Sequence, residues 1–319
     1  MKILTIGTGV IGTIYSCVLV NQGHDVTHYV RKGKADNMES RIAIDMLDKR
    51  KGHPKRSMFQ YTYQLTETLT SDNDYNFILI AVKVCQLDEL LKKITGVTGK
   101  ACIVFFTGNW AGTDFIEKYL PKGSFLFADP IAGGTFHGKT LVATLNNRLP
   151  MGEIDGTITD RLTILDSIFN HAGIKVVRPT DILHWHWLQY ALNAGMWPAL
   201  VRAKNLKAII NDRSLVEDIF YCIAECINVC VKRGVNLDEY PQIKRYTSNC
   251  KLNVLFMKYA FPFILEHSEY HRRCMAHALD DPKEIKTFYN DVLNTGRKLG
   301  LKMLYFSKFQ NDIEKFSNT

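Results

Sequence analysis

The sequence predicts an α/β domain followed by an all-helical C-terminal domain. The chain opens with an apolar strand that leads directly into a glycine-rich turn. Short apolar segments with strand character then alternate with helical segments as far as about residue 178, and only long helical segments follow. A length of 319 residues is well above the usual size of one domain. We therefore expect two domains, residues 1–178 and 179–319.

Residues 1–34, MKILTIGTGVIGTIYSCVLVNQGHDVTHYVRKGK, form the start of a β-α-β unit. A strand at 2–6 precedes a GxGxxG turn, a helix follows to about residue 21, and a second strand covers 25–30. A GxGxxG turn between a strand and a helix is typical of a Rossmann-type dinucleotide-binding domain. Its glycines permit the tight turn, the approach of a pyrophosphate and close helix packing, while the helix N-terminus attracts phosphate. The expected binding loop is Gly7, Thr8, Gly9, Val10, Ile11 and Gly12.

The end of the second strand indicates which dinucleotide is bound. This strand ends in YVRKGK and lacks the acidic residue that would bind an adenosine ribose 2′-hydroxyl. Arg31 and Lys32 occupy that place, and a guanidinium can bind a 2′-phosphate through two hydrogen bonds. We therefore expect NADP(H) rather than NAD(H). The alternative interpretation is a solvated basic loop.

Two further buried strands, NFILIAVK and ACIVFFTGN, end in polar residues. Ligands of doubly wound sheets lie beyond the carboxyl ends of the strands, so Lys83 and Asn109 are candidates to face the nicotinamide half of the cofactor. Either residue can equally be an ordinary loop residue. The segment MFQYTYQ is expected to pair at one side of the sheet. The rest of the domain is expected to consist of SFLFADPIAGG, TLVATL, RLPMGEI, a helix at TDRLTILDSIFNHAG and a strand at IKVVRP.

The second half is predicted to be helical at about 182–203, 214–233, 253–278 and 283–299. Such a domain commonly supplies substrate contacts. Its first helix contains HWHWLQYALNAGMWP, with three of the chain's four tryptophans. Because residues three or four apart share a helix face, one stripe is predicted to carry His186, Gln189, Asn193 and Trp197.

Composition excludes several other classes of protein. The net charge of +8 suits a phosphate-rich cofactor and an anionic substrate. The basic segment DKRKGHPKR is interpreted as a solvated loop, because it lacks the interleaved aromatic residues of a nucleic-acid site.

No apolar run reaches the roughly 20 residues of a membrane span, and the N-terminus enters a strand without a leader. Cys222, Cys226 and Cys230 are interpreted as core residues rather than metal ligands. We expect no metal and a reducing, cytoplasmic setting.

Over nearly its whole length the chain resembles the ketopantoate reductase (2-dehydropantoate 2-reductase) family. The segments that carry the resemblance are KILTIGTGVIG, Arg31, AVKVCQLDELL with Lys83, NWAGT at Asn109, MGEIDG, WLQYALN…P at 187–198, and EIKTFYN at Glu284. The resemblance implies NADPH-dependent reduction of a 2-keto acid, as in pantothenate biosynthesis. It also implies cofactor roles for the glycine loop, Arg31, Lys83, Asn109 and Gly134, and substrate roles for Asn193 and Glu284.

Two residues depart from the family pattern. The family's proton-donating lysine is replaced by Gln189, and its second helix asparagine is replaced by Trp197. Its substrate-binding serine has no secure match, although Cys274 lies nearby. A glutamine can donate a hydrogen bond to the substrate oxygen, but it cannot lose a proton near neutral pH. The proton can instead come from His186, from Lys204 or from a bound water.

Glu284 also has a structural interpretation, because DDPKE places Asp281 as a helix N-cap, Pro282 at the first helical position and Glu284 at the third. The expected function is reduction of ketopantoate or a related carbonyl compound. The alternative is a non-catalytic NADP(H)-binding sensor or partner-binding protein that has lost its acid. The expected partners are a small anionic substrate and a second copy of the chain, with no nucleic acid and no membrane.

Overall fold

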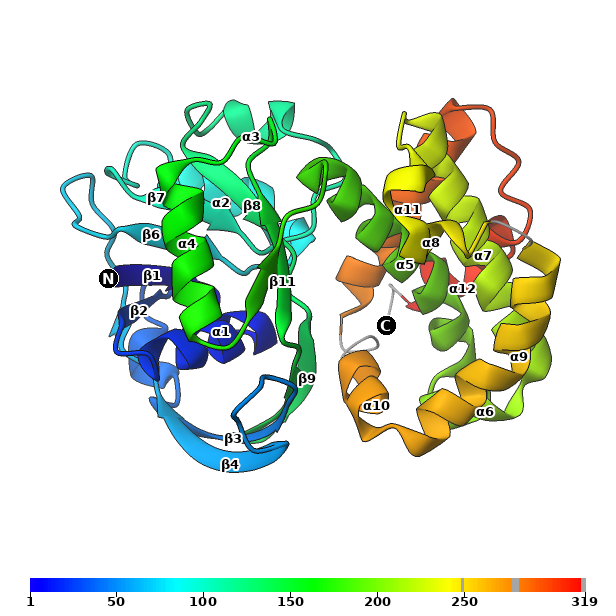
Figure 1. Cartoon of the computed structure of the whole chain (residues 1–319), viewed down its shortest axis with the longest axis horizontal. Coiled ribbons are helices and arrows are strands. Elements are labelled where there is room, and N and C mark those ends of the chain that lie inside the picture. The colour runs from blue at the N-terminus through cyan, green and yellow to red at the C-terminus, as the bar shows by residue number, and fades with distance from the viewer. Residues whose placement is uncertain (248–249, 277–280, 317–319) are drawn as a thin grey trace. The chain divides into compact units, whose positions relative to one another are not determined.

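The computed structural model describes residues 1–247, 250–276 and 281–316 (Figure 1). The chain divides into two compact units, Met1–Leu183 and His184–Thr319. The first unit contains two β-sheets with helices, and the second is helical throughout the residues described. The fold class predicted from the sequence is therefore confirmed.

The larger sheet of the first unit has the strand order β12-β11-β8-β7-β6-β1-β2-β5. Its neighbouring strands are parallel except where β11 pairs antiparallel with β8. The chain runs from β1 to β2 on one side and resumes at β6 on the other. The carboxyl ends of β1 and β6 therefore flank the switch point where ligands bind in such sheets. The strands are β1 (Lys2–Ile6), β2 (Asp25–Tyr29), β5 (Leu65–Thr66), β6 (Phe77–Ile80), β7 (Cys102–Phe105), β8 (Phe125–Ala128), β11 (Arg148–Gly152) and β12 (Lys175–Val177).

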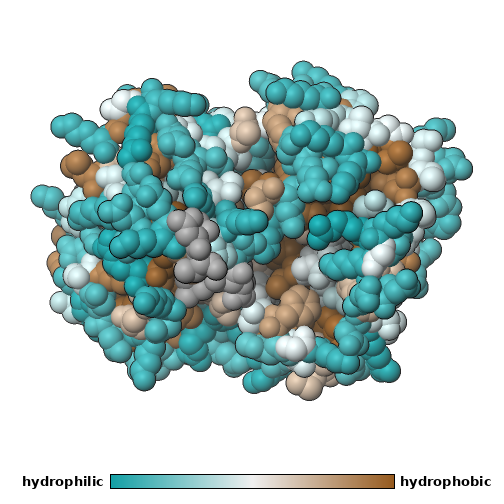
Figure 2. Space-filling model, turned by 180° about the vertical axis from the view of Figure 1, so that it is seen from behind, coloured by the Kyte–Doolittle hydropathy of each residue, from teal (hydrophilic) through white to brown (hydrophobic). Residues whose placement is uncertain are grey.

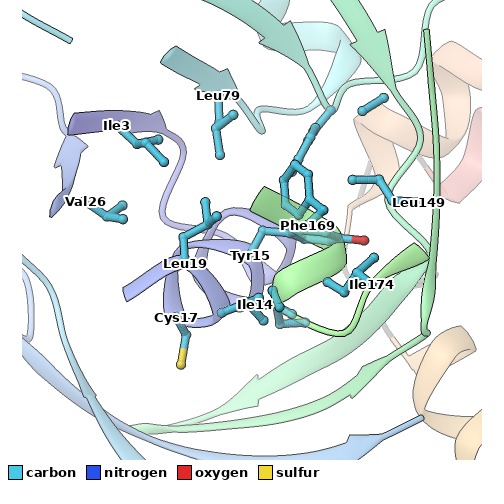
Figure 3. Close-up of a cluster of buried hydrophobic side chains, with 14 of the residues drawn as sticks. Ile3, Ile14, Tyr15, Cys17, Leu19, Val26, Leu79, Leu149, Phe169 and Ile174 are labelled. Carbon is cyan, nitrogen blue, oxygen red and sulfur yellow. The ribbon is translucent and has the colours of Figure 1, made fainter. Parts of the chain in front are cut away.

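The smaller sheet covers the opposite side of α1 (Val10–Val20). Its strand order is β4-β3-β10-β9, from β3 (Arg41–Asp48), β4 (Arg56–Thr62), β9 (Ala132–His137) and β10 (Thr140–Leu145). Because α1 contacts β1 and β2 on one side and β9 and β10 on the other, residues 12–19 are all buried. Figure 3 shows Ile14, Tyr15, Cys17 and Leu19 of α1 within this core. A helix enclosed in this way is expected to be largely apolar all round, and its buried polar side chains need hydrogen-bond partners.

One sequence-based interpretation of this region was wrong and another was only partly right. The segment MFQYTYQ does not pair at the side of the main sheet, since most of it forms β4 of the smaller sheet, antiparallel to β3. The segment 48–56 is not wholly a solvated loop, because Arg50 is only 8% exposed. Its guanidinium donates to both carboxylate oxygens of Asp48 and, at 2.8 Å, to the carbonyl of Ala172, which follows α4 (Asp160–His171). These partners compensate the cost of burying a charge.

The second unit is built around α5 (Ile182–Ala203), which has the predicted bounds. Its close packing on α7 (Arg213–Lys232) requires Gly195, because a Cβ there would lie 2.7 Å from Cα of Ile223. The helix predicted at 253–278 is instead α9 (Cys250–His267) and α10 (Glu269–Met275), since the Ser268 side chain caps α10. Residues 277 and 278 lie outside the described part. The other helices of the unit are α6 (Leu206–Asn211), α8 (Pro241–Lys244), α11 (Pro282–Lys298) and α12 (Gln310–Phe316).

Cys222, Cys226 and Cys230 lie on one buried face of α7. Burial raises the pKa of the Cys230 thiol to about 12 and also raises the pKa values of the Cys222 and Cys226 thiols. Among residues 1–247, 250–276 and 281–316, no cluster of His, Cys, Asp and Glu is arranged to hold a metal ion. No helix in the same described ranges is long and apolar enough to cross a membrane. The surface seen in Figure 2 is mainly hydrophilic with smaller hydrophobic areas.

Candidate functional site

The turn after β1 contains three glycines, and the structure gives a different reason for glycine at each position. Gly7 has φ +124°, and a Cβ there would collide with the carbonyl oxygen of Ala81, just after β6. A Cβ on Gly12 would collide with the carbonyl oxygen of Gly7. A Cβ on Gly9 would have nothing within 4 Å, so this glycine leaves open space in front of the helix. The turn therefore brings a helix N-terminus close to two strand ends and leaves room for a ligand.

The first turn of α1 presents unpaired backbone donors to that space. The first intrahelical bond is donated by the Thr13 amide to the Gly9 carbonyl at 3.0 Å. The preceding N–H groups, of Val10, Ile11 and Gly12, have no acceptor within the helix. No acidic residue lies in this turn, so the positive end of the helix dipole is not offset. The arrangement favours an anion such as a pyrophosphate.

A pocket of about 430 Å³ opens beside this turn and falls within the usual size range of ligand sites. Its charged lining consists of the cations Arg31, Lys34, Lys83 and Lys93 and the carboxylate Glu89. Glu89 forms an ion pair with Lys93 at 2.5 Å, one helical turn away. The excess of positive charge suits a ligand with several phosphates. The remaining lining residues are Ile6, Gly7, Thr8, Gly9, Tyr29, Val30, Ala81, Val82, Gln86, Leu90 and Phe136.

Lys32, Asn109 and Gly134, which were predicted to bind the cofactor, do not line this pocket. Lys32 is exposed on the same loop as Arg31 and is not among the residues that line the pocket. The Asn109 side chain is buried and bonds the backbone of Gly112, accepting at 2.9 Å and donating at 3.0 Å. Gly134 lies in β9 with φ +152°, where a Cβ would collide with the Val142 carbonyl oxygen of β10. For Asn109 and Gly134 the structure thus gives local folding reasons for the residue type.

A buried polar network supports the glycine turn, and sequence analysis missed it. Thr5 and Ser16 share a hydrogen bond at 2.7 Å, which joins β1 to α1. Thr13 of α1 bonds the Tyr63 hydroxyl at 2.8 Å. His28 of β2 bonds the Tyr61 hydroxyl of β4 at 2.9 Å, and burial lowers its pKa to about 4. The only sequence signal was the presence of polar residues within otherwise apolar elements.

In the second unit, the side chains of the predicted stripe on α5 differ in their burial. His186 and Trp197 are buried, at 2% and 7% exposure, whereas Gln189 and Asn193 are half-buried. Trp197 packs against Phe288 of α11, with ring centroids 4.6 Å apart. Burial lowers the pKa of His186 to about 4, so this side chain is neutral at pH 7. Gln189 and Asn193 therefore form the accessible polar part of the helix.

The half-buried Glu284 lies in the first turn of α11. The N-cap Asp281 accepts hydrogen bonds from the amides of Lys283 at 3.0 Å and Glu284 at 3.1 Å, as the capping interpretation predicted. Phe288, one turn further along, stacks on Tyr190 of α5 at 3.8 Å. Because residues four apart share a helix face, we expect Glu284 to lie on the side of α11 that faces α5.

A parallel sheet with a glycine turn, a helix N-terminus and a cationic pocket at its switch point defines the class of dinucleotide-binding α/β proteins. Residues 3–154 match the model of the family "Ketopantoate reductase PanE/ApbA". A curated relative, 2-dehydropantoate 2-reductase of Aquifex aeolicus, is 23% identical over 258 residues, which cover 76% of this chain and 78% of that protein. The chain is thus similar to ketopantoate reductases in sequence, most clearly over residues 3–154, as the resemblance implied.

Solved structures share the fold. A dimeric ketopantoate reductase from Staphylococcus aureus has a TM-score of 0.69 and 14% identity, with 100% of this chain and 99% of that chain covered. A ternary structure of D-mandelate dehydrogenase with NADH and anilino(oxo)acetate has a TM-score of 0.72 and 13% identity, with 100% and 98% covered. At such low identity these likenesses establish the fold alone.

The two buried histidines predict a stability loss in mild acid. Their folded-state pKa values are about 4, against 6.5 when exposed, so the unfolded chain binds protons that the folded chain does not. Stability is complete above pH 6.5 and falls as the pH drops towards 4, by roughly 2 kcal/mol per histidine between pH 7 and pH 5. Urea unfolding at both pH values measures this loss. Between pH 7 and pH 5, His186→Gln should lose less free energy of unfolding than wild type, because glutamine does not take up a proton on unfolding. An equal loss would contradict the burial of neutral His186.

Proposed function

We propose that the protein is an NADPH-dependent reductase of a 2-keto acid. The observation that carries this proposal is the cationic pocket at the glycine turn, with Arg31 just after β2, in a chain that is similar to ketopantoate reductases. The cofactor, when bound, supplies a hydride to the carbonyl carbon of the substrate. The backbone amides of α1 bind the pyrophosphate, Arg31 binds the 2′-phosphate, and Lys83 lies towards the nicotinamide half.

Gln189 and Asn193 bind the substrate in this proposal, and Glu284 contributes from α11. The side-chain amides of Gln189 and Asn193 donate hydrogen bonds to the carbonyl oxygen and the carboxylate of the substrate. These bonds stabilise the negative charge that develops on the carbonyl oxygen. Glu284 accepts a hydrogen bond from a hydroxyl or an ordered water. Neither amide can release a proton, so the product oxygen must be protonated by another group.

Water is the proton source that fits best. Protonated His186 is scarce at neutral pH, because burial lowers its pKa to about 4, so we do not propose it as the donor. Lys204 follows the end of α5, fifteen residues beyond Gln189, which is about 22 Å along the helix at 1.5 Å per residue. A water bound by the Gln189 and Asn193 amides would lie beside the substrate oxygen that these amides hold, and could donate the proton.

A non-catalytic NADP(H)-binding protein is the alternative, and Gln189 in place of a lysine is the observation that favours it. Turnover separates the two functions, because both require cofactor binding.

The first functional prediction concerns Arg31. Arg31→Ala should weaken NADPH binding by about 1.5–3 kcal/mol, the usual scale for a hydrogen bond to a charged group, and should leave NADH binding nearly unchanged. Fluorescence titration with both cofactors measures this difference. Equal weakening of both would show that Arg31 does not bind the 2′-phosphate.

The second prediction concerns turnover. NADPH oxidation, followed at 340 nm with a panel of 2-keto acids that includes ketopantoate and phenylglyoxylate, should reveal a slow reductase. Gln189→Lys should raise turnover, because general acid catalysis typically contributes 10²–10⁴-fold. Gln189→Met is the matched control, since it has similar size but neither donates a hydrogen bond nor carries a proton, and it should lower turnover.

If NADPH binds and neither wild type nor Gln189→Lys oxidises it with any acid, the non-catalytic alternative is favoured. The further change Trp197→Asn, which would complete the family pattern, is unsuitable as a test because Trp197 is a core residue. Truncating such a side chain typically costs about 3–5 kcal/mol of stability.

We also propose that the protein forms a homodimer through α9. Leu252, Leu255, Phe256, Tyr259 and Phe263 are each 56–68% exposed and fall on one face of this helix. In an antiparallel pair centred on Tyr259, Leu255 meets Phe263 of the second copy, because both are four residues from the centre. Lys251 of one copy then lies beside Glu266 of the other, so the rim charges are complementary. An isologous contact of this kind closes as a dimer.

The dimer is tested by sedimentation equilibrium. Wild type should be dimeric at micromolar concentration, and Phe256→Glu should be monomeric. The melting temperature of this variant should equal that of wild type measured at a concentration low enough for the wild-type dimer to dissociate, which shows that the variant is folded. Leu304→Glu is the control, because Leu304 is 62% exposed in the same unit but lies outside α9. A monomeric wild type, or a Phe256→Glu variant that remains dimeric, would contradict the proposed interface.

A further inference from the structure

The loop that follows β2 carries three basic side chains on a short turn. Arg31, Lys32 and Lys34 lie within four residues, and Arg31 and Lys34 both line the pocket. The Lys34 amide donates to the Arg31 carbonyl at 3.0 Å, and Gly33 has φ +76°. Like charges this close repel one another, so a nearby negative charge favours this conformation of the loop.

Glu67 supplies that counter-charge from the neighbouring edge strand. It follows β5, which runs parallel to β2, and the Val30 amide donates to the Thr66 carbonyl at 2.9 Å. The Glu67 carboxylate accepts a hydrogen bond from the Ala35 amide at 2.8 Å. Its pKa is lowered by the backbone N–H groups of Gly33, Ala35 and Lys34, and also by the charge of Lys32. The Glu67 carboxylate is thus bonded to the Ala35 amide and lies near the other backbone N–H groups of the turn.

We propose that Glu67 is a positioning residue that sets the preference for NADPH by fixing the basic loop for the 2′-phosphate. The inference rests on the proposed function, because it concerns the same cofactor site. Glu67 is absent from the pocket lining, so it acts through Arg31 and Lys34 rather than by contact with the cofactor. It was not identified from the sequence, since it lies 36 residues beyond Arg31 in a segment without a motif.

Removing Glu67 has two effects of opposite sign on NADPH binding. Loss of a negative charge near the phosphate strengthens binding, but this effect is small because the carboxylate is largely solvated and screened. Loss of the amide bonds frees the loop, and the cofactor must then order Arg31 and Lys34 when it binds. Hydrogen bonds to a charged group are stronger than screened surface charges, so we expect the positioning effect to dominate.

The test compares three variants by fluorescence titration with NADPH and NADH. Glu67→Ala should raise the Kd for NADPH about tenfold, the equivalent of one lost charge-assisted hydrogen bond, and should change the Kd for NADH by less than about twofold. Glu67→Gln keeps an acceptor oxygen and should recover part of the loss. Asp36→Asn removes one exposed negative charge from the next turn, η1 (Ala35–Asn37), and should not weaken NADPH binding.

Each outcome is decisive. NADPH binding by Glu67→Ala that equals or exceeds that of wild type overturns the positioning role, and so does equal weakening of both cofactors. The unchanged NADH affinity shows that the variant is folded. If wild type binds NADPH with preference and only the Glu67 result fails, the proposed function stands without this inference. If wild type binds neither cofactor, both are overturned.

Discussion

The close approach of α1 to the carboxyl ends of β1 and β6 is the constraint on which the cofactor site depends. Gly7 and Gly12 are required because any Cβ would meet backbone oxygen, of Ala81 in one case and of Gly7 in the other. The smaller sheet covers the outer face of α1 and completes its burial. The helix is therefore held on both sides, with its N-terminus directed at the switch point. A phosphate that binds there finds its donors already oriented.

The charge of the pocket is the basis of the proposed preference for NADPH. The pocket has four cationic side chains and a single carboxylate, and that carboxylate is paired with Lys93. The basic residues come from the loop after β2 and from the segment after β6, which lie on either side of β1. In the second unit, Tyr190 donates to Asp291 at 2.6 Å and fixes α5 against α11. Gln189 and Asn193 lie on an accessible face of a helix that is otherwise well anchored.

Local signals in the sequence were sufficient to predict those elements that contain a motif or a regular spacing of apolar residues. The glycine turn and the full extent of α5 were predicted from local pattern, and the structure has both where predicted, while Arg31 lines the pocket beside the turn. Features set by long-range packing could not be predicted. The smaller sheet pairs β3 with β10, which lies almost a hundred residues later in the chain. Arg50 is buried beside Ala172, whose carbonyl accepts a hydrogen bond from its guanidinium. The burial of Trp197 in the stripe on α5 could not be predicted for a related reason, since helical spacing cannot say which residues α11 covers.

The roles of the candidate residues differ in how directly the structure supports them. Asn109 and Gly134 are explained by local backbone contacts, whereas the residues around the glycine turn surround an accessible pocket. The crystal structure of the protein with NADP⁺ tests the central claim most directly. The account predicts the pyrophosphate at the first turn of α1 and the 2′-phosphate within hydrogen-bonding distance of Arg31. A pyrophosphate bound elsewhere, or a 2′-phosphate remote from Arg31, would contradict it.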